Sequence, residues 1–414
     1  MLEPPVDQLI SVVSAIDILD HAPVFPRIES ILLSNAHSRT LAKPILADRD
    51  YPPFDRSLMD GFAVMSDDVG QGIRRFSVVG SIAAGQMSDK TLRSGQAMKI
   101  MTGAPLPAGA DGVVPVEDTH GGSEPGKWSD ADFFELMRAG EPRRFVSRRG
   151  SECAANAEIL SAGARLTPAA LAAAATAGAA SVSVFARPTV SIVTTGDEII
   201  PFDQTPSGSE IRNSNSILLA SLLQQAGCEV LIKAHAPDDP QKIRRAISAA
   251  PGQLIFVSGG MSMGEHDHVP GVLRECGFDL PITKLRIKPG KPFAFGIANN
   301  SGNSSGGSRF AFGLPGNPVS AFVCTTRLAM RIIRRLQGQS PEPAWRVGRL
   351  TAALPANGPR EFYQPVQVEE DRITPLGWKG SADVFTLARA RGLLIRGENS
   401  PAIEVGSVVR VMEV

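Results

Sequence analysis

The sequence has no excess of charge of either sign. Its 42 lysine and arginine residues balance 42 aspartate and glutamate residues, so the formal net charge is zero. Proteins that bind nucleic acid carry a basic excess on their binding surface, and without one we expect no nucleic-acid partner. Arginines at positions 331, 334 and 335 form a small local cluster, which we interpret as solvated surface.

Cysteine is scarce and unpaired. The four cysteines form no C-x-x-C motif, and none has a histidine at zinc-finger spacing: Cys153, Cys228, Cys276 and Cys324. We therefore expect small buried thiols in a reducing cytoplasm. The sequence also lacks a Cys–His or Ser–His–Asp pattern that would indicate a catalytic nucleophile.

Long apolar runs are absent as well. The sequence has no window of about 18 uninterrupted apolar residues, and residues 1–30 hold no basic segment followed by an apolar run. We expect neither a membrane span nor a signal peptide, and a cytoplasmic location. The chain is 43% hydrophobic and 20% charged, which is typical of packed globular domains. At roughly 100–200 residues per domain, 414 residues predict about two to four domains.

Strands and helices alternate between residues 186 and 338. Residues 190–195, VSIVTT, form a β-branched run typical of a strand buried on both faces. Further strands are expected at 229–232, 254–257, 283–288, 292–297 and 309–313, and helices at 214–226, 240–249, ending near 276, and at 318–336. Consecutive strand–loop–helix units predict a mostly parallel sheet with helices on both faces. Such sheets bind ligands at the carboxyl ends of their strands.

The flanking regions show other patterns. Residues 6–20 have the apolar spacing of an amphipathic helix, a second helix is expected near 26–38, and residues 167–178 predict a third. Short strand-like runs between glycine, proline and aspartate fill residues 61–146, which indicates an all-β module. Residues 339–414 return to short strands and predict a small all-β domain.

Acidic residues follow two of the expected parallel strands. Asp197 and Glu198 follow the first strand, and Asp238 with Asp239 follows the next one. Carboxylates at this edge can hold a hard divalent cation through oxygen. Asp197 could instead cap the following turn. One acid of the Asp238–Asp239 pair would N-cap the helix at 240–249, which leaves the other free.

Glycine-rich loops are expected at the same edge. In SGGMSMGEHD (258–267), Gly259 and Gly260 can take positive φ, so that successive N–H groups converge on an anion, with Asp267 just downstream. GLPGNP (313–318) opens a helix with Asn317 at the N-cap, and a helix N-terminus also suits an anion. A plain glycine turn and a well-capped helix remain the alternatives.

Lysines complete this set of loops. Lys284 and Lys288 lie around IKPGK, and lysines held on a turn suit polyphosphate or oxyanion recognition. A β-turn with exposed lysines is the alternative. Taken together, the loops predict a site for a phosphorylated ligand together with a metal or an oxyanion.

Two acids, Asp55 and Asp60, lie five residues apart in PPFDRSLMDGFAV (52–64). This stretch mixes turn residues with strand residues, and its composition assigns a role to neither acid.

Seven motifs in a fixed order carry a resemblance to a known family. They are PPFDRSLMDGFAV, IMTGAPLP with GADGVVPVEDT, TTGDEI, IRNSNS, SGGMSMGEHD, IKPGKPFAFG and GLPGNP. In this order, and over nearly the whole chain, the sequence resembles the molybdopterin molybdenumtransferases, a family that includes the C-terminal domain of gephyrin.

The resemblance implies a multidomain α/β plus β fold in four parts. These are a mostly parallel three-layer αβα domain of the molybdopterin-binding type (1–22 plus 184–338), a connecting domain (23–50 plus 147–183), the all-β module (51–146) and a β-barrel-like C-terminal domain (339–414). It also implies a homodimer whose active site lies between the αβ domain of one subunit and the β module of the other.

The implied reaction transfers molybdenum from molybdate to adenylyl-molybdopterin, which releases AMP and forms molybdenum cofactor, with Mg²⁺ assisting. Transient contacts with molybdopterin synthesis enzymes and apo molybdoenzymes would follow. The sequence does not separate molybdate from tungstate, because both are tetrahedral dianions of similar size.

The family's site residues carry over position by position. The resemblance implies a catalytic set of Asp60, Thr102, Glu198, Asp238 and Asp267, in which Glu198, Asp238 and Asp267 also hold the metal. Substrate and phosphate would be bound by Gly259, Gly260, Ser262, Lys284, Lys288, Pro315, Gly316, Pro318 and Ser381. Asp60 would act from across the dimer, and Asp55 would be a local turn or capping residue.

The chain also departs from the family pattern. Ser147 stands where many relatives have an arginine of an R-x-x-G-[ED]-D-type loop, Glu152 stands at the acid position, and His268 replaces a common tyrosine. Arg148 or Arg149 could replace the missing arginine.

Two functions compete with the transferase: an adenylyltransferase or pyrophosphatase on the same αβ domain, and a non-enzymatic scaffold. Relatives with the first activities lack PPFDRSLMDGFAV, and the retained site acids argue against the scaffold.

Overall fold

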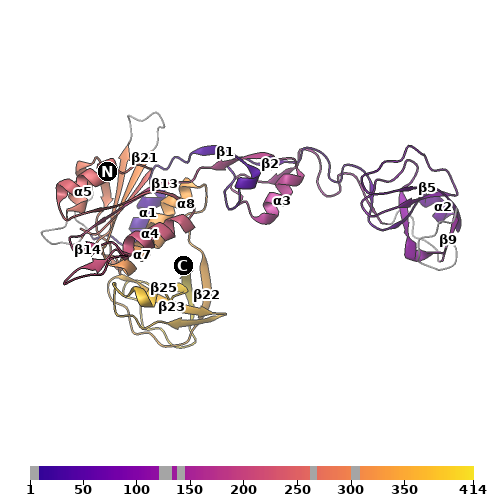
Figure 1. Ribbon diagram of the computed structural model, residues 1–414. Coiled ribbons are helices and arrows are strands. Elements are labelled where there is room, and N and C mark those ends of the chain that lie inside the picture. Colours follow the sequence, from indigo (N-terminus) through magenta and orange to yellow (C-terminus); the bar gives the residue numbers. More distant parts are fainter. Residues whose placement is uncertain (1–8, 121–132, 138–144, 262–267, 300–307) are drawn as a thin grey trace. The chain divides into compact units, whose positions relative to one another are not determined.

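The computed structural model describes residues 9–120, 133–137, 145–261, 268–299 and 308–414. The chain divides into two compact units (Figure 1). The first unit combines Met1–Glu29 with Val184–Val414, and the second is Ser30–Ser183. No helix in the described ranges is long and apolar enough to cross a membrane.

The first unit contains a six-stranded sheet. Its strand order is β16 (Glu229–Ala236), β13 (Thr189–Thr195), β17 (Leu254–Ser258), β21 (Ser308–Leu314), β20 (Ala294–Asn299) and β18 (Asp279–Ile282). The first four strands run parallel to one another, and β20 and β18 are antiparallel to their neighbours. The expectation of a mostly parallel sheet is confirmed.

Helices cover both faces of this sheet. One face packs against α1 (Val12–His21), α4 (Ser214–Gln225), α7 (Pro318–Cys324) and α8 (Met330–Leu336). The other face packs against α5 (Pro240–Ala249) and α6 (Val269–Glu275). Successive residues of a strand alternate between faces: Ile192 belongs to the first core and Val193 to the second, and both are fully buried. Because strand β13 is apolar on both faces, the sheet packs against helices on each side, which gives three layers.

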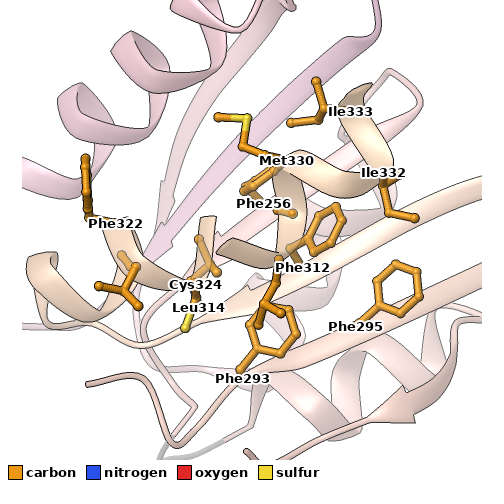
Figure 2. Close-up of a cluster of buried hydrophobic side chains, with 14 of the residues drawn as sticks. Phe256, Phe293, Phe295, Phe312, Leu314, Phe322, Cys324, Met330, Ile332 and Ile333 are labelled. Carbon is orange, nitrogen blue, oxygen red and sulfur yellow. The ribbon is translucent and has the colours of Figure 1, made fainter. Parts of the chain in front are cut away.

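Aromatic rings fill the larger core (Figure 2). The Phe312 ring centroid lies 4.9 Å from that of Phe256 and 5.4 Å from that of Phe295, within the range of favourable aromatic pairs. The helix expected at 318–336 is present, and residues Thr325–Ala329 form a π-helical turn between α7 and α8.

The interpretation of the arginine cluster as solvated surface was wrong for Arg331. Its side chain is 2% exposed and forms two hydrogen bonds to Asp20, of 2.7 and 2.5 Å, and one of 2.9 Å to Glu342. Arg335 donates to the carbonyl groups of Leu19 and Ala22. The cluster joins α8 to α1, a contact between distant parts of the sequence that local charge patterns do not reveal.

The C-terminal part of the first unit is a closed sheet. Its strands are β22 (Trp345–Leu350), β23 (Glu361–Glu369), β24 (Arg372–Pro375), β25 (Gly392–Arg396) and β26 (Val408–Glu413). Because β23 pairs with both β24 and β25, the sheet closes into a barrel. The short strand β19 (Ile287–Lys288) adds to β23, and the short helix α9 (Val384–Leu387) precedes β25.

The second unit contains another six-stranded sheet. Its order is β7 (Gly112–Pro115), β4 (Gly61–Val64), β6 (Gln96–Ile100), β5 (Arg75–Ile82), β9 (Phe133–Leu136) and β8 (Thr119–His120). Short elements accompany it: β2 (Ile45–Leu46), β3 (Arg56–Ser57), β10 (Val146–Ser147), β11 (Glu158–Leu160), α2 (Ser66–Gly70) and α3 (Pro168–Thr176). This agrees with the strand-like runs in the sequence. The segment 121–132 lies outside the described residues.

Two expected elements were wrong. Residues 26–38 do not form a helix: β1 (Ile28–Leu32) pairs with β12 (Ser181–Phe185), and a 3₁₀ turn follows at Leu33–Asn35. Ile28 and Leu32, which suggested a helical apolar face, are 55% and 61% exposed. Pairing with a distant strand therefore determines that this segment forms a strand and not a helix. Of the strand expected at 283–288, only Ile287–Lys288 is extended, as β19, and it pairs with β23. The strand of the mostly parallel sheet in this region, β18, ends earlier, at Ile282.

Candidate functional site

A cleft of about 690 Å³ lies at the carboxyl ends of the four parallel strands. The loops that follow β13, β16, β17 and β21 all contribute to its lining, as expected for a sheet of this type. The expected site residues that line it are Glu198, Asp238, Gly259, Gly260, Pro315, Gly316 and Pro318. Seven positions spread over 121 residues of sequence thus meet in one place.

The structure separates the roles of Asp197 and Glu198. The Asp197 side chain accepts a hydrogen bond of 3.1 Å from the Asp238 backbone N–H, so it ties the loop after β13 to the loop after β16. Glu198 lines the cleft. Gly196, with φ of +137°, makes this turn possible, because a Cβ there would lie 2.7 Å from the Glu198 Oε2 atom.

The adjacent acids Asp238 and Asp239 also differ. Asp239 is the N-cap of α5 and accepts hydrogen bonds of 2.8 and 3.1 Å from the N–H groups of Gln241 and Lys242. These hydrogen bonds, that from Lys242 first, lower the pKa of Asp239. Asp238 lines the cleft, and its buried Oδ1 atom has no hydrogen-bond partner among the described residues. One acid therefore caps the helix, and the other keeps an unpaired carboxylate oxygen in the cleft wall.

The glycine loop after β17 adopts the expected conformation. Gly259 and Gly260 have φ values of +105° and +59°. A Cβ at Gly259 would lie 2.5 Å from both the carbonyl oxygen and the Oγ1 atom of Thr195, and one at Gly316 would lie 3.8 Å from the Gly259 Cα. Close approach of three backbones therefore requires glycine at 259.

Two buried side chains of the cleft were not among the expected site residues. The Asn215 Nδ2 atom donates to the Ser258 Oγ atom (2.8 Å) and to the Gly316 carbonyl (2.7 Å), which fixes the orientation of the amide. The Asn215 Oδ1 and Thr195 Oγ1 atoms are buried and have no partner within the described ranges. Both positions were part of quoted motifs, IRNSNS and TTGDEI, but nothing local shows that their polar atoms remain unpaired.

The start of α7 differs from the expected N-cap. Asn317 occupies the N-cap position, but its side chain makes no capping hydrogen bond and donates instead to the Ser381 Oγ atom at 2.9 Å. The Val319 N–H donates to the Ser381 carbonyl at 3.0 Å, and Pro318 has no N–H. The first turn of α7 is therefore partly satisfied from the C-terminal barrel, which places Ser381 beside the cleft.

The structure does not bring the two expected lysines into the cleft formed by the described residues. Lys288 places its Nζ atom 4.9 Å from the centre of the Phe362 ring, a cation–π contact with the barrel. The Lys284 carbonyl accepts a hydrogen bond from the Ile10 N–H. Lys288 is itself part of β19 and pairs with Phe362 of β23, and Lys284 lies shortly before β19 in the chain. Turn chemistry alone does not indicate this tertiary contact.

The expected metal ligands are only partly described. Asp267 and Ser262 lie outside the described residues. Among the residues that the structure does place, no group of three or more acidic, histidine or cysteine side chains could hold a metal ion. Glu198 and Asp238 are the two carboxylates of the expected set that line the cleft.

Asp60 and Thr102 form a separate small site in the second unit. The Asp60 Oδ1 atom accepts hydrogen bonds from the Thr102 N–H (2.7 Å) and hydroxyl (2.8 Å). These bonds, the backbone one first, lower the pKa of Asp60, so its carboxylate is ionised at neutral pH. Gly61 allows β4 to approach β7, since a Cβ there would lie 2.0 Å from the Val114 carbonyl oxygen. The result is an exposed, oriented carboxylate.

Asp55 has a structural role. Its carboxylate accepts hydrogen bonds from the Arg149 N–H (2.8 Å) and from the Arg148 side chain (2.5 Å). It therefore joins two segments 94 residues apart in the chain, which is more than the local turn we expected. Arg149 in turn pairs with Asp50 at 2.7 Å.

The departures from the family pattern lie close to these contacts. Glu152 forms an ion pair of 2.6 Å with Arg56, and the Ser147 hydroxyl lies 3.2 Å from that of Ser151. The charges of Glu152 and of the arginines at 148 and 149 are thus balanced within the second unit.

Comparison with known protein families gives three consecutive matches. The model described as the MoeA N-terminal region (domain I and II) matches residues 10–178, the probable molybdopterin binding domain matches residues 191–335, and the MoeA C-terminal region (domain IV) matches residues 347–414.

Similar proteins cover nearly the whole chain. The chain is 32% identical to the molybdopterin molybdenumtransferase of Bacillus subtilis, over 93% of this chain and 89% of that protein. It is 34% identical to that of Haemophilus influenzae, over 95% of each. A crystal structure of a molybdopterin biosynthesis MoeA protein from Pyrococcus horikosii matches with a TM-score of 0.83 and 26% identity, and covers 98% of this chain and 99% of that one.

Proposed function

This chain belongs to the molybdopterin molybdenumtransferase family, and we propose that it transfers molybdenum from molybdate to adenylyl-molybdopterin, with release of AMP and formation of molybdenum cofactor. The observation that carries the proposal is the cleft at the carboxyl ends of the four parallel strands, which is lined by carboxylates, by glycine turns and by residues whose buried polar atoms have no partner among the described residues. Such a cleft suits a phosphorylated ligand accompanied by a cation.

The residues of the cleft fit a hard divalent cation. The buried, unpartnered Asp238 Oδ1 atom is a hard oxygen donor, and Glu198 supplies a second carboxylate. When bound, Mg²⁺ would neutralise charge on the phosphates and on the departing AMP. Asp267, which lies outside the described residues, would complete the acidic set that the family resemblance implies.

The glycine loops would receive the phosphate groups. Gly259 and Gly260 have positive φ, a conformation found in backbone turns that bind anions. The Gly259 N–H donates to the Leu314 carbonyl at 3.1 Å, so the Gly260 N–H would be the one to meet a phosphate. The absence of side chains at 259 and 316 lets a ligand approach the backbone closely. The amide of Asn215, held by two hydrogen bonds, would present its Oδ1 atom to a donor group of the ligand.

We propose that the lysines bind the molybdate oxyanion and that the partner subunit supplies a further acid, Asp60. Lys284 and Lys288 would attract molybdate, and Asp60, oriented by Thr102, would act as a metal ligand or in proton transfer. This requires a homodimer in which the β module of one subunit faces the cleft of the other. The proposal includes the four parts that the family resemblance implies: the αβ domain, the connecting domain, the all-β module and the C-terminal domain.

The decisive experiment supplies the purified protein with adenylyl-molybdopterin, molybdate and MgCl₂. We expect AMP release and activation of an apo molybdoenzyme. AMP at the level of a protein-free control would refute the transferase, and tungstate in place of molybdate tests the choice of oxyanion.

A matched pair of variants tests the role of the cleft. Asp238→Asn removes the ligand charge and should lower AMP release by about 10- to 100-fold, the range expected for losing an interaction with a charged group. Asp239→Asn is the control, because asparagine caps helices as well as aspartate does. Equal activity of the two variants would contradict the assignment of Asp238.

A second pair tests the role of Asp60. Asp60→Asn should lose activity while the protein remains dimeric, and Asp67→Asn, at an exposed acid of α2 in the same module, should not. Mixing Asp60→Asn with Asp238→Asn subunits should restore activity if the site is shared between subunits.

A further inference from the structure

A phenylalanine of the C-terminal barrel is exposed at the cleft. Phe385 lies on α9 and lines the cleft together with the carboxylates and glycine loops. Its side chain is 82% exposed, the largest value for any large hydrophobic residue in the described part of the chain. The exposed side chain of Ile211, at 53%, lines the same cleft.

The fold prevents Phe385 from turning inward. The next two residues of α9, Thr386 and Leu387, are 3% and 7% exposed and anchor the opposite side of this short helix. The Asp383 side chain caps the helix by accepting from the Thr386 N–H at 3.0 Å and from the Thr386 hydroxyl at 2.8 Å. Rotating the helix to bury Phe385 would expose Leu387 and break this cap.

The position of α9 relative to the cleft is also held. The Ser381 carbonyl accepts from the Val319 N–H, and the Ser381 hydroxyl accepts from the Asn317 side chain. Ser381 precedes α9 by three residues and is therefore tied to the loop that supplies Pro315, Gly316 and Pro318 to the cleft. The aromatic ring and the polar loops thus belong to one binding surface.

This surface has two chemical characters. Its polar part is lined by Glu198, Asp238 and the glycine loops, while Phe385 and Ile211 present apolar area to solvent. A ligand that matches both parts carries charged or hydrogen-bonding groups at one end and a flat apolar face at the other. Planar heteroaromatic rings stack on exposed aromatic side chains in a way that tolerates ring identity.

We propose that Phe385 is a specificity-determining residue that stacks on a planar heteroaromatic ring of the substrate, with Ile211 as a second apolar contact. The inference rests on the proposed function, in which the substrate carries two such rings, the purine of its adenylyl group and the pterin.

The experiment measures binding of three probes by isothermal titration calorimetry: AMP, ribose 5-phosphate and 6-hydroxymethylpterin. Phe385→Ala removes the ring and Phe385→Tyr retains it. Phe25→Ala removes a phenylalanine that is 57% exposed in the same unit but does not line the cleft. The full-length dimer or monomer is used as purified, and sedimentation records its oligomeric state.

Phe385→Ala should weaken one ring-bearing probe by about 5- to 150-fold, equivalent to about 1–3 kcal/mol for stacking on one aromatic side chain. Ribose 5-phosphate, Phe385→Tyr and Phe25→Ala should show little change. Loss confined to AMP identifies the purine as the stacked ring, and loss confined to the pterin identifies the pterin.

Unchanged affinity for both ring probes, or no saturable binding of either to the unmodified protein, overturns the inference. A shift of Phe385→Ala to a smaller species also overturns it, because the ring would then serve a subunit contact. Molybdenum insertion is measured in parallel. If the unmodified protein inserts molybdenum and Phe385→Ala binds both rings normally, only the stacking is contradicted. If the unmodified protein is inactive and Phe385→Ala loses ring binding, only the transferase function is contradicted.

Discussion

Replacing Gly61 by alanine should disrupt the β module next to Asp60. A Cβ at this position would lie 2.0 Å from the Val114 carbonyl oxygen and 2.9 Å from the Pro115 Cα. Carbon–oxygen contacts are normally at least about 3.3 Å, so β4 and β7 would have to separate by more than about 1 Å. That movement stretches the ladder between Gly61–Val64 and Gly112–Pro115 beyond hydrogen-bonding distance at one end.

The expected cost follows from two contributions. Overpacking of a well-packed site costs about 1–3 kcal/mol, and each ladder hydrogen bond that is lost costs about 1 kcal/mol. We therefore expect the module to lose about 3 kcal/mol of local stability. Because the Asp60 carbonyl accepts from the Val116 N–H at 3.1 Å, the same movement displaces Asp60 from Thr102 and should lower molybdenum insertion.

Amide hydrogen exchange measured by mass spectrometry reports this loss without requiring two-state unfolding of the whole chain. Peptides covering β4 and β7 should exchange roughly 100-fold faster in Gly61→Ala. Gly80→Ala is the control in the same sheet, since its Cβ would lie 3.6 Å from the flexible end of Met98. That variant should be unchanged or slightly more stable. Equal exchange of Gly61→Ala and the unmodified protein would refute the steric argument.

Three further predictions concern burial. Burial raises the pKa of the Cys228 thiol to about 12 and raises that of Cys324 as well. At pH 8 a thiol reagent should therefore modify two of the four cysteines in the native protein and all four after denaturation. Rapid reaction of four native thiols would contradict this. Burial also raises the pKa of Glu361 above its usual value of 4.5. The folded state therefore holds this proton more tightly than the unfolded state, and stability falls as the pH rises from about 4.5 toward the raised pKa. Between pH 4 and 8, Glu361→Gln should show a smaller fall in melting temperature than the unmodified protein. Asp20→Ala leaves the buried Arg331 guanidinium with one carboxylate partner and should lower the free energy of unfolding by about 3 kcal/mol in urea titrations; a loss below about 1 kcal/mol would show that the pair contributes little.

Much of the site could be predicted because its chemistry is local in sequence. Glycines at 259 and 260 were expected to take positive φ, and they do. Of the two acids before α5, one was expected to cap the helix and the other to remain free, and Asp239 and Asp238 divide in this way. What the sequence left open was which acid plays which part, because the N-cap is defined only once the first helical residue is known.

Other parts of the site depend on contacts between distant segments. The side chain of Asn317 was expected to cap α7, but Ser381 of the barrel takes its hydrogen bond. Lys288 was expected to face an anion, and in this structure it contacts Phe362. In both cases a residue from the C-terminal barrel is the partner. The sequence near Asn317 or Lys288 has no periodicity or turn pattern that would predict this partner.

The sequence by itself determined the three-layer domain and the identity of the loops that line the cleft at the carboxyl edge of its sheet. Buried parallel strands need continuous apolar runs, and tight turns that follow them need glycine, so both leave a local signal. Only the tertiary structure decided that residues 28–32 pair as a strand, that Arg331 is buried against α1, and that Phe385 stays exposed in the cleft. Each of these outcomes depends on which surfaces remain uncovered after the chain has folded, and that is a property of all the contacts together.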